Sequence, residues 1–109
     1  MTEPVIIPEI SVRDLAALGA DARIIDVREP DEWDAGHIAH AVHVQLGTVP
    51  DRVEAFDGSP TYVICLAGGR SQRACEYVAA QGREVVNVAG GMRAWAEAGF
   101  DIVPGRDGG

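Results

Sequence analysis

The sequence predicts an α/β protein with a mostly parallel five-stranded sheet and helices on both faces. Short apolar runs alternate along the chain with segments of helical pattern, and this alternation is typical of parallel sheets. Several of the runs are apolar at consecutive positions, as strands buried on both faces are. The length of 109 residues is that of one domain with one core. A single domain over residues 1–109 is therefore expected.

Five short strands are expected, each bounded by glycine, proline or polar residues. They fall at residues 5–7, 24–27, 41–44, 62–64 and 84–88. Pro4 and Pro8 bracket the first strand, and the third alternates between apolar and polar positions more than the others do.

Helices are expected between these strands, at residues 12–18, 30–33, 50–56, 71–81 and 92–98. Ser11 is the expected N-cap of the first helix, and Gly19 its end. Pro30 opens the second helix, and Pro50 lies in the first turn of the third. Three other helices end at glycines, namely Gly36, Gly82 and Gly99. The polar tail from Gly105 to the end of the chain has no expected packing role.

Composition and charge limit the classes of function. Nine basic and seventeen acidic residues give a net charge of -8, which argues against a nucleic-acid partner because backbone binding needs a basic face. A small anionic substrate needs only local positive potential and stays possible. No apolar run approaches membrane-spanning length, and residues 1–10 lack a basic segment followed by a hydrophobic one. A soluble, cytoplasmic protein without a membrane partner is expected.

The segment that carries chemistry begins at Cys65, directly after the strand at 62–64. Gly68 and Gly69 permit backbone conformations in which successive N–H groups face inward and bind an anion. Arg70 adds a positive charge, and the helix that starts near Ser71 adds its dipole. All three features would lower the pKa of the thiol and hold an anion at the sulfur. Such a cradle suits a persulfide or a thiophosphate.

A structural interpretation of the same segment is also available. Cys65 would then be a small buried hydrophobe, the glycines would serve only the turn, and Arg70 would pair with a surface acid. The spacing favours the nucleophile. Asp26 and Arg28 follow another strand and are expected in the same cleft, since sites form at the carboxyl ends of parallel strands. Their ion pair would either support the cleft or only tether a loop.

Other candidate residues are better explained by structure. His37, His40 and His43 straddle a turn and a strand and need not share a face, so a metal site is not favoured. Cys75 lies on the probable core face of its helix and is expected to be inert. Two large aromatic residues are expected to pack in the core or at its rim, Trp33 and Trp95. Two cysteines allow at most one disulfide, unlike a stapled secreted scaffold.

Three segments together resemble the rhodanese family. Residues 65–71, Cys-Leu-Ala-Gly-Gly-Arg-Ser, resemble the C-x-x-G-x-R-S active-site loop of its single-domain members. Residues 26–33 and 36–38 resemble the family's D-V-R-E…E-(F/W)…G-H-I segment, and residues 88–95 resemble its G-G-x-x-A-W segment. The resemblance implies the three-layer rhodanese-like fold, with a core at about 7–103 and a tail at 104–109.

The resemblance also implies sulfur transfer through Cys65. A sulfane sulfur would move from a donor such as thiosulfate to Cys65 and then to cyanide, a thiol or a protein partner. The loop N–H groups would cradle the persulfide and Arg70 would bind the anionic donor, with substrate contacts at Leu66, Ala67, Gly68, Gly69 and Arg70. Ser71, Asp26 and Arg28 would support the site. No metal and no organic cofactor are implied.

Two alternatives and two departures qualify this assignment. Phosphatases and arsenate reductases of the same fold resemble His-Cys followed by five residues and Arg, whereas here Ile64 precedes Cys65 and four residues separate it from Arg70. A persulfide carrier serving one protein partner is the non-enzymatic alternative. Leu66 replaces the basic residue that often follows the cysteine in thiosulfate-preferring members, which leaves the donor open. His40 stands where the family usually has glycine.

Overall fold

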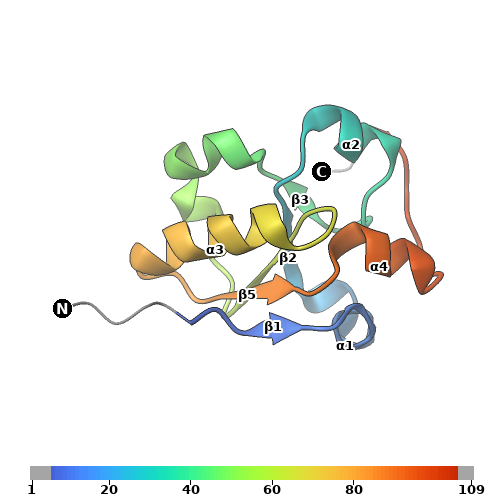
Figure 1. The fold of residues 1–109 in the computed structure, drawn as a ribbon, viewed down its shortest axis with the longest axis horizontal. Coiled ribbons are helices and arrows are strands. Elements are labelled where there is room, and N and C mark those ends of the chain that lie inside the picture. The colour runs from blue at the N-terminus through green and yellow to red at the C-terminus, as the bar shows by residue number, and fades with distance from the viewer. Residues whose placement is uncertain (1–5, 106–109) are drawn as a thin grey trace.

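The computed structural model describes residues 6–105, and within them five strands form one parallel sheet (Figure 1). The strand order is β1-β5-β4-β2-β3, so β4 lies at the centre. The strands are β1 Glu9–Ile10, β2 Arg23–Asp26, β3 Val42–His43, β4 Thr61–Ile64 and β5 Val85–Val88. Each neighbouring pair is parallel. The predicted α/β class with a five-stranded parallel sheet is confirmed.

Four α-helices and three short 3₁₀ helices lie between and after these strands within residues 6–105. The α-helices are α1 Val12–Leu18, α2 Pro30–Ala35, α3 Gly69–Ala80 and α4 Gly91–Glu97. The 3₁₀ helices are η1 Gly19–Asp21, η2 Leu46–Asp51 and η3 Val53–Ala55. Most lie at or near the predicted positions, because their boundaries are set by local capping groups. Ser11 Oγ, for example, accepts a hydrogen bond from Asp14 N–H across 3.1 Å and caps α1.

The sheet separates two apolar cores, which makes the fold three-layered. On one face, Ile25 and Val63 pack with buried residues of α3 and of the η2–η3 region, such as Val78. On the other face, Ile24 and Ile64 pack against buried residues of α1, α2 and α4. Neighbouring residues of one strand point to opposite faces, so both faces of β2 and β4 are buried. Helices cover both faces as predicted.

The first predicted strand, at residues 5–7, is wrong. Val5 lies outside the described residues, and Ile6 and Ile7 are not in a strand. The strand forms instead at Glu9–Ile10, which pairs with Asn87 and Val88 of β5. Ile7 is nevertheless buried in a core. The apolar side chain of Ile7 therefore predicted its burial correctly. The position of so short an edge strand depends on the strand with which it pairs and not on its own sequence.

The predicted helix at 50–56 is replaced by η2 and η3. Pro50 lies inside η2 and not in the first turn of an α-helix. Proline lacks an N–H group and its ring clashes with the carbonyl four residues earlier in an α-helix. The chain therefore uses shorter-range bonds, such as Arg52 N–H to the Val49 carbonyl at 2.9 Å.

Residues 99–105, here called the C-terminal strap, run back from α4 to α2 (Figure 1). Val103 forms an isolated antiparallel bridge with His37, with N–H to carbonyl distances of 2.8 and 2.9 Å. Gly105 N–H donates to the Asp34 carbonyl at 3.0 Å. Gly105, the first residue of the tail for which no packing role was expected, is exposed but is attached by this hydrogen bond. Residues 106–109 of that tail lie outside the described part of the chain.

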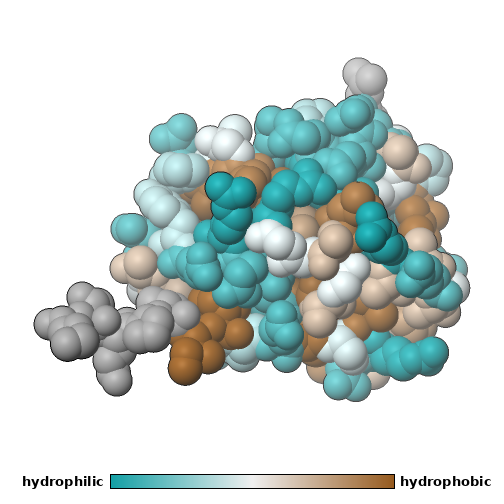
Figure 2. All heavy atoms as spheres, in the orientation of Figure 1, coloured by the Kyte–Doolittle hydropathy of each residue, from teal (hydrophilic) through white to brown (hydrophobic). Residues whose placement is uncertain are grey.

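The surface alternates in character over short distances. On the face drawn in Figure 2, hydrophobic residues reach the surface in small patches separated by hydrophilic ones. Between residues 6 and 105, no helix combines the length and the apolar character needed to cross a bilayer.

Candidate active site

Cys65 is held at the carboxyl end of the central strand. It follows β4 directly, its side chain belongs to the core beneath α3, and only 1% of the residue is exposed. Residues 65–68 turn from the strand into α3, which begins at Gly69, two residues earlier than predicted. Gly68 is the N-cap residue with φ of 112°, a left-handed conformation that glycine adopts without strain.

Hydrogen-bond donors of the loop converge on the sulfur. Gly68 N–H donates to Cys65 Sγ across 3.0 Å, and the Ser71 hydroxyl lies 3.3 Å from the same atom. Burial raises the pKa of the Cys65 thiol. The Ser71 hydroxyl and the N–H groups of Ser71, Gly68 and Ala67 lower it, and their combined effect exceeds that of burial, so the pKa falls below its ordinary value. The direction of this shift is the predicted one, whereas its largest lowering cause, the Ser71 hydroxyl, was not among the predicted causes.

The first turn of α4 orients the backbone of the cysteine loop. Met92 N–H donates to the Cys65 carbonyl at 2.8 Å, and Arg93 N–H donates to the Leu66 carbonyl at 2.9 Å. These bonds turn both carbonyls toward α4. A Cβ at Gly91 would collide with the same carbonyls, so only glycine permits this close approach.

Asn87 is a site residue that the sequence analysis missed. It is 2% exposed in β5, and its Nδ2 donates to the Gly68 carbonyl at 3.1 Å. Because a carbonyl only accepts, this contact fixes Oδ1 toward the Ser71 hydroxyl, which donates to it across 2.5 Å. A buried amide among β-branched strand residues was the signal that could have revealed it.

Arg70 forms a bidentate ion pair with Glu32 of α2. Its Nη1 and Nη2 donate to Oε1 and Oε2 across 2.7 and 2.9 Å. The Arg70 guanidinium, together with the N–H of Glu29, holds the pKa of Glu32 at about 2, although burial acts in the opposite direction. The pKa of Arg70 is raised in turn, chiefly by Glu32. The sequence allowed Arg70 either to bind an anion at the sulfur or to pair with an acidic residue. The structure shows Arg70 paired with an acidic residue, Glu32, which was not predicted as its partner.

Asp26 and Arg28 form the predicted ion pair in a buried setting. Arg28 Nη2 and Nε donate to Asp26 Oδ2 across 2.8 and 3.0 Å, and the two residues are 5% and 0% exposed. Arg28 Nη2 also donates to the Gly36 carbonyl at 2.7 Å. This pair joins the end of β2 to the end of α2, and so fixes the helix that carries Glu32.

The remaining predicted residues lie either in the cysteine loop or in the core. Leu66 is half-buried, whereas Ala67 and Gly69 are exposed at the mouth of the loop. Cys75 is fully buried, and this burial raises its pKa to about 12. Trp33 is 3% exposed and Trp95 is 6% exposed, so both aromatic residues pack in the core as predicted.

The three histidines do not converge on a point. The rings of His37 and His43 both stack on Trp33, with centroids 3.6 and 4.9 Å away. His37 Nδ1–H donates to the Trp33 carbonyl, and His43 Nε2–H donates to the Arg28 carbonyl, while His40 is exposed. Within residues 6–105, no group of three His, Cys, Asp or Glu side chains is placed to hold a metal ion.

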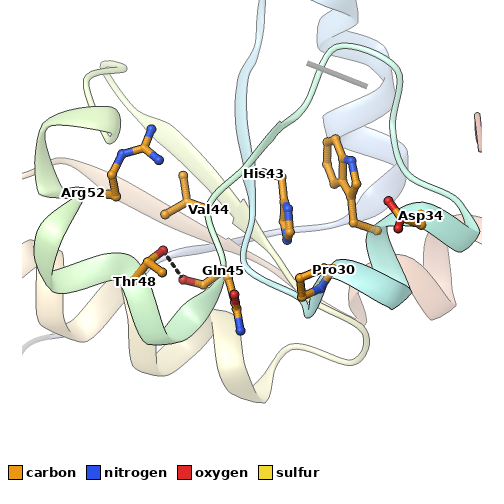
Figure 3. A pocket seen from close by; sticks show the side chains of 8 residues that line it. Pro30, Asp34, His43, Val44, Gln45, Thr48 and Arg52 are labelled. Carbon is orange, nitrogen blue, oxygen red and sulfur yellow. Dashed lines mark hydrogen bonds between the residues drawn. The ribbon is translucent and has the colours of Figure 1, made fainter. Parts of the chain in front are cut away.

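Two hollows flank α2. A hollow of about 360 Å³ adjoins the cysteine loop, and its walls include Leu66, Glu32, Met92, Ala96 and Ile102. A larger one, of about 520 Å³, lies between α2 and η2 (Figure 3) and is lined by Pro30, Trp33, Asp34, His43, Val44, Gln45, Thr48 and Arg52. None of those lining residues comes from the cysteine loop. The smaller hollow is therefore the one that belongs to the candidate site.

Comparison with known proteins assigns the fold to a family. The model of the rhodanese-like domain matches residues 11–98. The chain belongs to the rhodanese-like domain family. The crystal structure of a rhodanese-related protein from Thermoplasma volcanium superposes with a TM-score of 0.82 at 30% identity, covering 88% of this chain and 97% of that one. The predicted rhodanese-like architecture is thereby confirmed.

Several rhodanese-like relatives carry names that describe sulfur chemistry. YtwF of Bacillus subtilis, provisionally named a sulfurtransferase, is 47% identical over 73 residues, covering 66% of this chain and 71% of YtwF. The thiosulfate sulfurtransferase GlpE of Pseudomonas entomophila is 37% identical over 89 residues, covering 79% and 82%. YrkF of Bacillus subtilis, provisionally named a sulfur carrier protein, is 38% identical, covering 82% of this chain and 51% of YrkF.

Proposed function

We propose that this rhodanese-like domain is a sulfurtransferase that carries a sulfane sulfur on Cys65. The observation that supports this most directly is the setting of the sulfur. Gly68 N–H lies 3.0 Å from Sγ and the Ser71 hydroxyl lies 3.3 Å from it, and the pKa of the thiol is lowered. A thiolate is the form that attacks a sulfane sulfur.

The reaction proceeds in two half-reactions. In the first, the Cys65 thiolate attacks the outer sulfur of the donor, the sulfur–sulfur bond of the donor breaks, and its electron pair leaves with the donor's remaining group. With thiosulfate that group is sulfite. In the second, a nucleophilic acceptor attacks the outer sulfur of the Cys65 persulfide, and the bonding pair returns to Cys65 as thiolate. Loop N–H groups stabilise the negative charge of the persulfide between the two steps.

No metal and no organic cofactor take part in this scheme. The acceptor is a thiol or a protein thiol, and cyanide serves as a test acceptor. The names of YtwF and GlpE support transfer chemistry. The loop, with four residues between Cys65 and Arg70, is shorter than the loop expected for a phosphatase or an arsenate reductase.

A persulfide carrier that serves one protein partner is the second candidate. The similarity to YrkF favours it, although this chain spans about half the length of that protein. A carrier would accept sulfur on Cys65 but would turn over slowly with small acceptors. Comparing persulfide formation with cyanide turnover separates the two functions.

The test is intact mass spectrometry after treatment with a sulfane donor, on the wild type and on Cys65→Ser. We expect a gain of one sulfur atom that cyanide removes, in the wild type only. Cys75→Ser is the matched control, since Cys75 is fully buried, and it should gain the sulfur as the wild type does. A wild type that gains no sulfur from thiosulfate or from a thiol persulfide would contradict the proposal.

A further inference from the structure

We propose that Glu32 selects the sulfur donor, by neutralising Arg70 so that the site prefers the persulfide of a small thiol over the thiosulfate dianion. This inference rests on the proposed function, because it concerns the donor half-reaction at Cys65. It differs from the expectation that Arg70 serves as the binding group for an anionic donor.

The carboxylate of Glu32 is fixed independently of Arg70. Glu29 N–H donates to Glu32 Oε1 across 3.0 Å, and the Glu29 side chain accepts from the N–H of Glu32, which completes a capping box at the start of α2. Asp26 and Arg28 anchor the other end of this helix through the Gly36 carbonyl. The position of Glu32 is therefore set by α2, and the Arg70 side chain extends from the cysteine loop to bind it.

Both terminal nitrogens of the Arg70 guanidinium are engaged by Glu32, at 2.7 and 2.9 Å. Arg70 is the one cation in the loop sequence 65–71. Its paired charge attracts a further anion much less than a free guanidinium would. The nearby Glu29 adds another negative charge that acts on Arg70.

Other charges around the site do not restore a positive potential. Arg28 is neutralised by Asp26 in the buried pair described above. Arg93 and Glu97 of α4 both line the hollow beside Leu66, and they bring one charge of each sign. With Glu29 and the Cys65 thiolate included, the formal charges of these side chains sum to a negative value, which disfavours a dianion relative to a less charged donor.

The two sulfur donors differ in the negative charge that they bring to this site, and we therefore expect the site to prefer the less charged donor. Thiosulfate brings two negative charges to the thiolate and releases sulfite, which also carries two. A thiol persulfide, R–S–SH, is attacked at its outer sulfur; the inner sulfur leaves as R–S⁻, and the outer sulfur with its proton becomes the Cys65 persulfide. The total charge during this step is −1 with the protonated persulfide and −2 with its anion, against −3 with thiosulfate. The hollow of about 360 Å³, with walls that include Leu66, Met92, Ala96 and Ile102, is large enough for an uncharged R group.

The test compares two donors in the wild type and in Glu32→Gln. Glutamine keeps one oxygen to accept from Glu29 N–H, and it loses the charge together with the second acceptor for Arg70. Asp31→Asn is the matched control, because Asp31 is an exposed acid in the same turn of α2. The donors are thiosulfate and the persulfide of 2-mercaptoethanol, whose R group is uncharged. Steady-state KM and kcat are measured with each donor.

We expect the wild type to have a higher kcat/KM with the persulfide than with thiosulfate. In Glu32→Gln, KM for thiosulfate should fall by about fivefold or more, equivalent to about 1 kcal/mol, while kcat stays nearly constant. With the persulfide, both constants should change by less than about twofold, a difference of less than about 0.5 kcal/mol. Asp31→Asn should behave as the wild type does with both donors.

Three results would overturn the inference. They are a wild type that prefers thiosulfate, an unchanged KM for thiosulfate in Glu32→Gln, and an equal loss of kcat with both donors, which would make Glu32 purely structural. Each of these leaves sulfur transfer through Cys65 intact. A wild type that gains sulfur from neither donor would instead contradict the proposed function itself, so the two failures are distinguishable.

Discussion

The hydroxyl of Ser71 donates to Asn87 Oδ1 across 2.5 Å. The same hydroxyl lies 3.3 Å from Cys65 Sγ, and its single hydrogen serves one acceptor at a time. When Cys65 is a thiol, the shorter contact holds that hydrogen at Asn87. When Cys65 ionises, rotation about the Cβ–Oγ bond brings the hydrogen to the thiolate, where a charged acceptor makes the stronger bond.

We therefore expect Ser71→Ala to raise the pKa of Cys65. Burial, which raises this pKa, would remain, and the largest opposing contribution would be lost. The measurement is the rate of alkylation by iodoacetamide as a function of pH. Since a higher pKa leaves less thiolate at neutral pH, alkylation and sulfur transfer should both slow. The experiment is cleanest in a Cys75→Ser background, and a midpoint equal to or below that of the parent would contradict this account of Ser71.

The stability of the fold should depend on the ionisation of Glu32. Its pKa is about 2 in the folded protein against an ordinary value of 4.5. A lowered acid pKa contributes stability above the ordinary value, and this contribution is lost as the pH falls from 4.5 toward 2. Because Glu32 is partly exposed, we expect on the order of 1 to 2 kcal/mol.

Urea unfolding of the wild type and Glu32→Gln at several pH values measures this contribution. The difference in the free energy of unfolding should be largest at neutral pH and should shrink as Glu32 protonates. Asp31→Asn again serves as the control for removing one charge from α2. A difference that stays constant down to pH 2 would show that Glu32 stabilises the fold through something other than its charge.

Two glycines near the site should respond in opposite ways to alanine. Gly91→Ala places a Cβ against the carbonyls of Cys65 and Leu66 at φ of 58°, so we expect a loss of at least about 2 kcal/mol. Gly69→Ala meets no atom within 4 Å, and at the start of α3 it should be neutral or stabilising by about 0.5 kcal/mol. Thermal or urea unfolding measures both. Equal destabilisation by the two changes would be inconsistent with the close packing of α4 on the loop.

Local signals explain how much of the fold could be predicted from the sequence. Ser11 caps α1, Pro30 opens α2, and Gly19 ends α1 at φ of 72°. Each of these residues acts on its immediate neighbours, so a linear pattern is enough to find them. The position of Cys65 after a buried strand was predictable for the same reason.

Partner choice across the chain could not be predicted in this way. Arg70 lies 38 positions from Glu32, and seventeen acidic residues are present in the sequence. Only the packing of α2 beside the loop determines which carboxylate meets the guanidinium. Asn87 is similar, because its role depends on β5 lying beside β4, which places its amide under both Gly68 and Ser71.

The C-terminal strap offers a place to attach a second function. Val103 pairs with His37, and Gly105 is bonded to Asp34 of α2, the helix that also holds Arg70 through Glu32. A peptide attached after Gly105 would thus begin beside α2, the helix that carries Glu32. On a short flexible linker, a thiol in that peptide would face Cys65 at an effective concentration on the order of millimolar. Fusion at this end could then turn a freely diffusing acceptor into an intramolecular one.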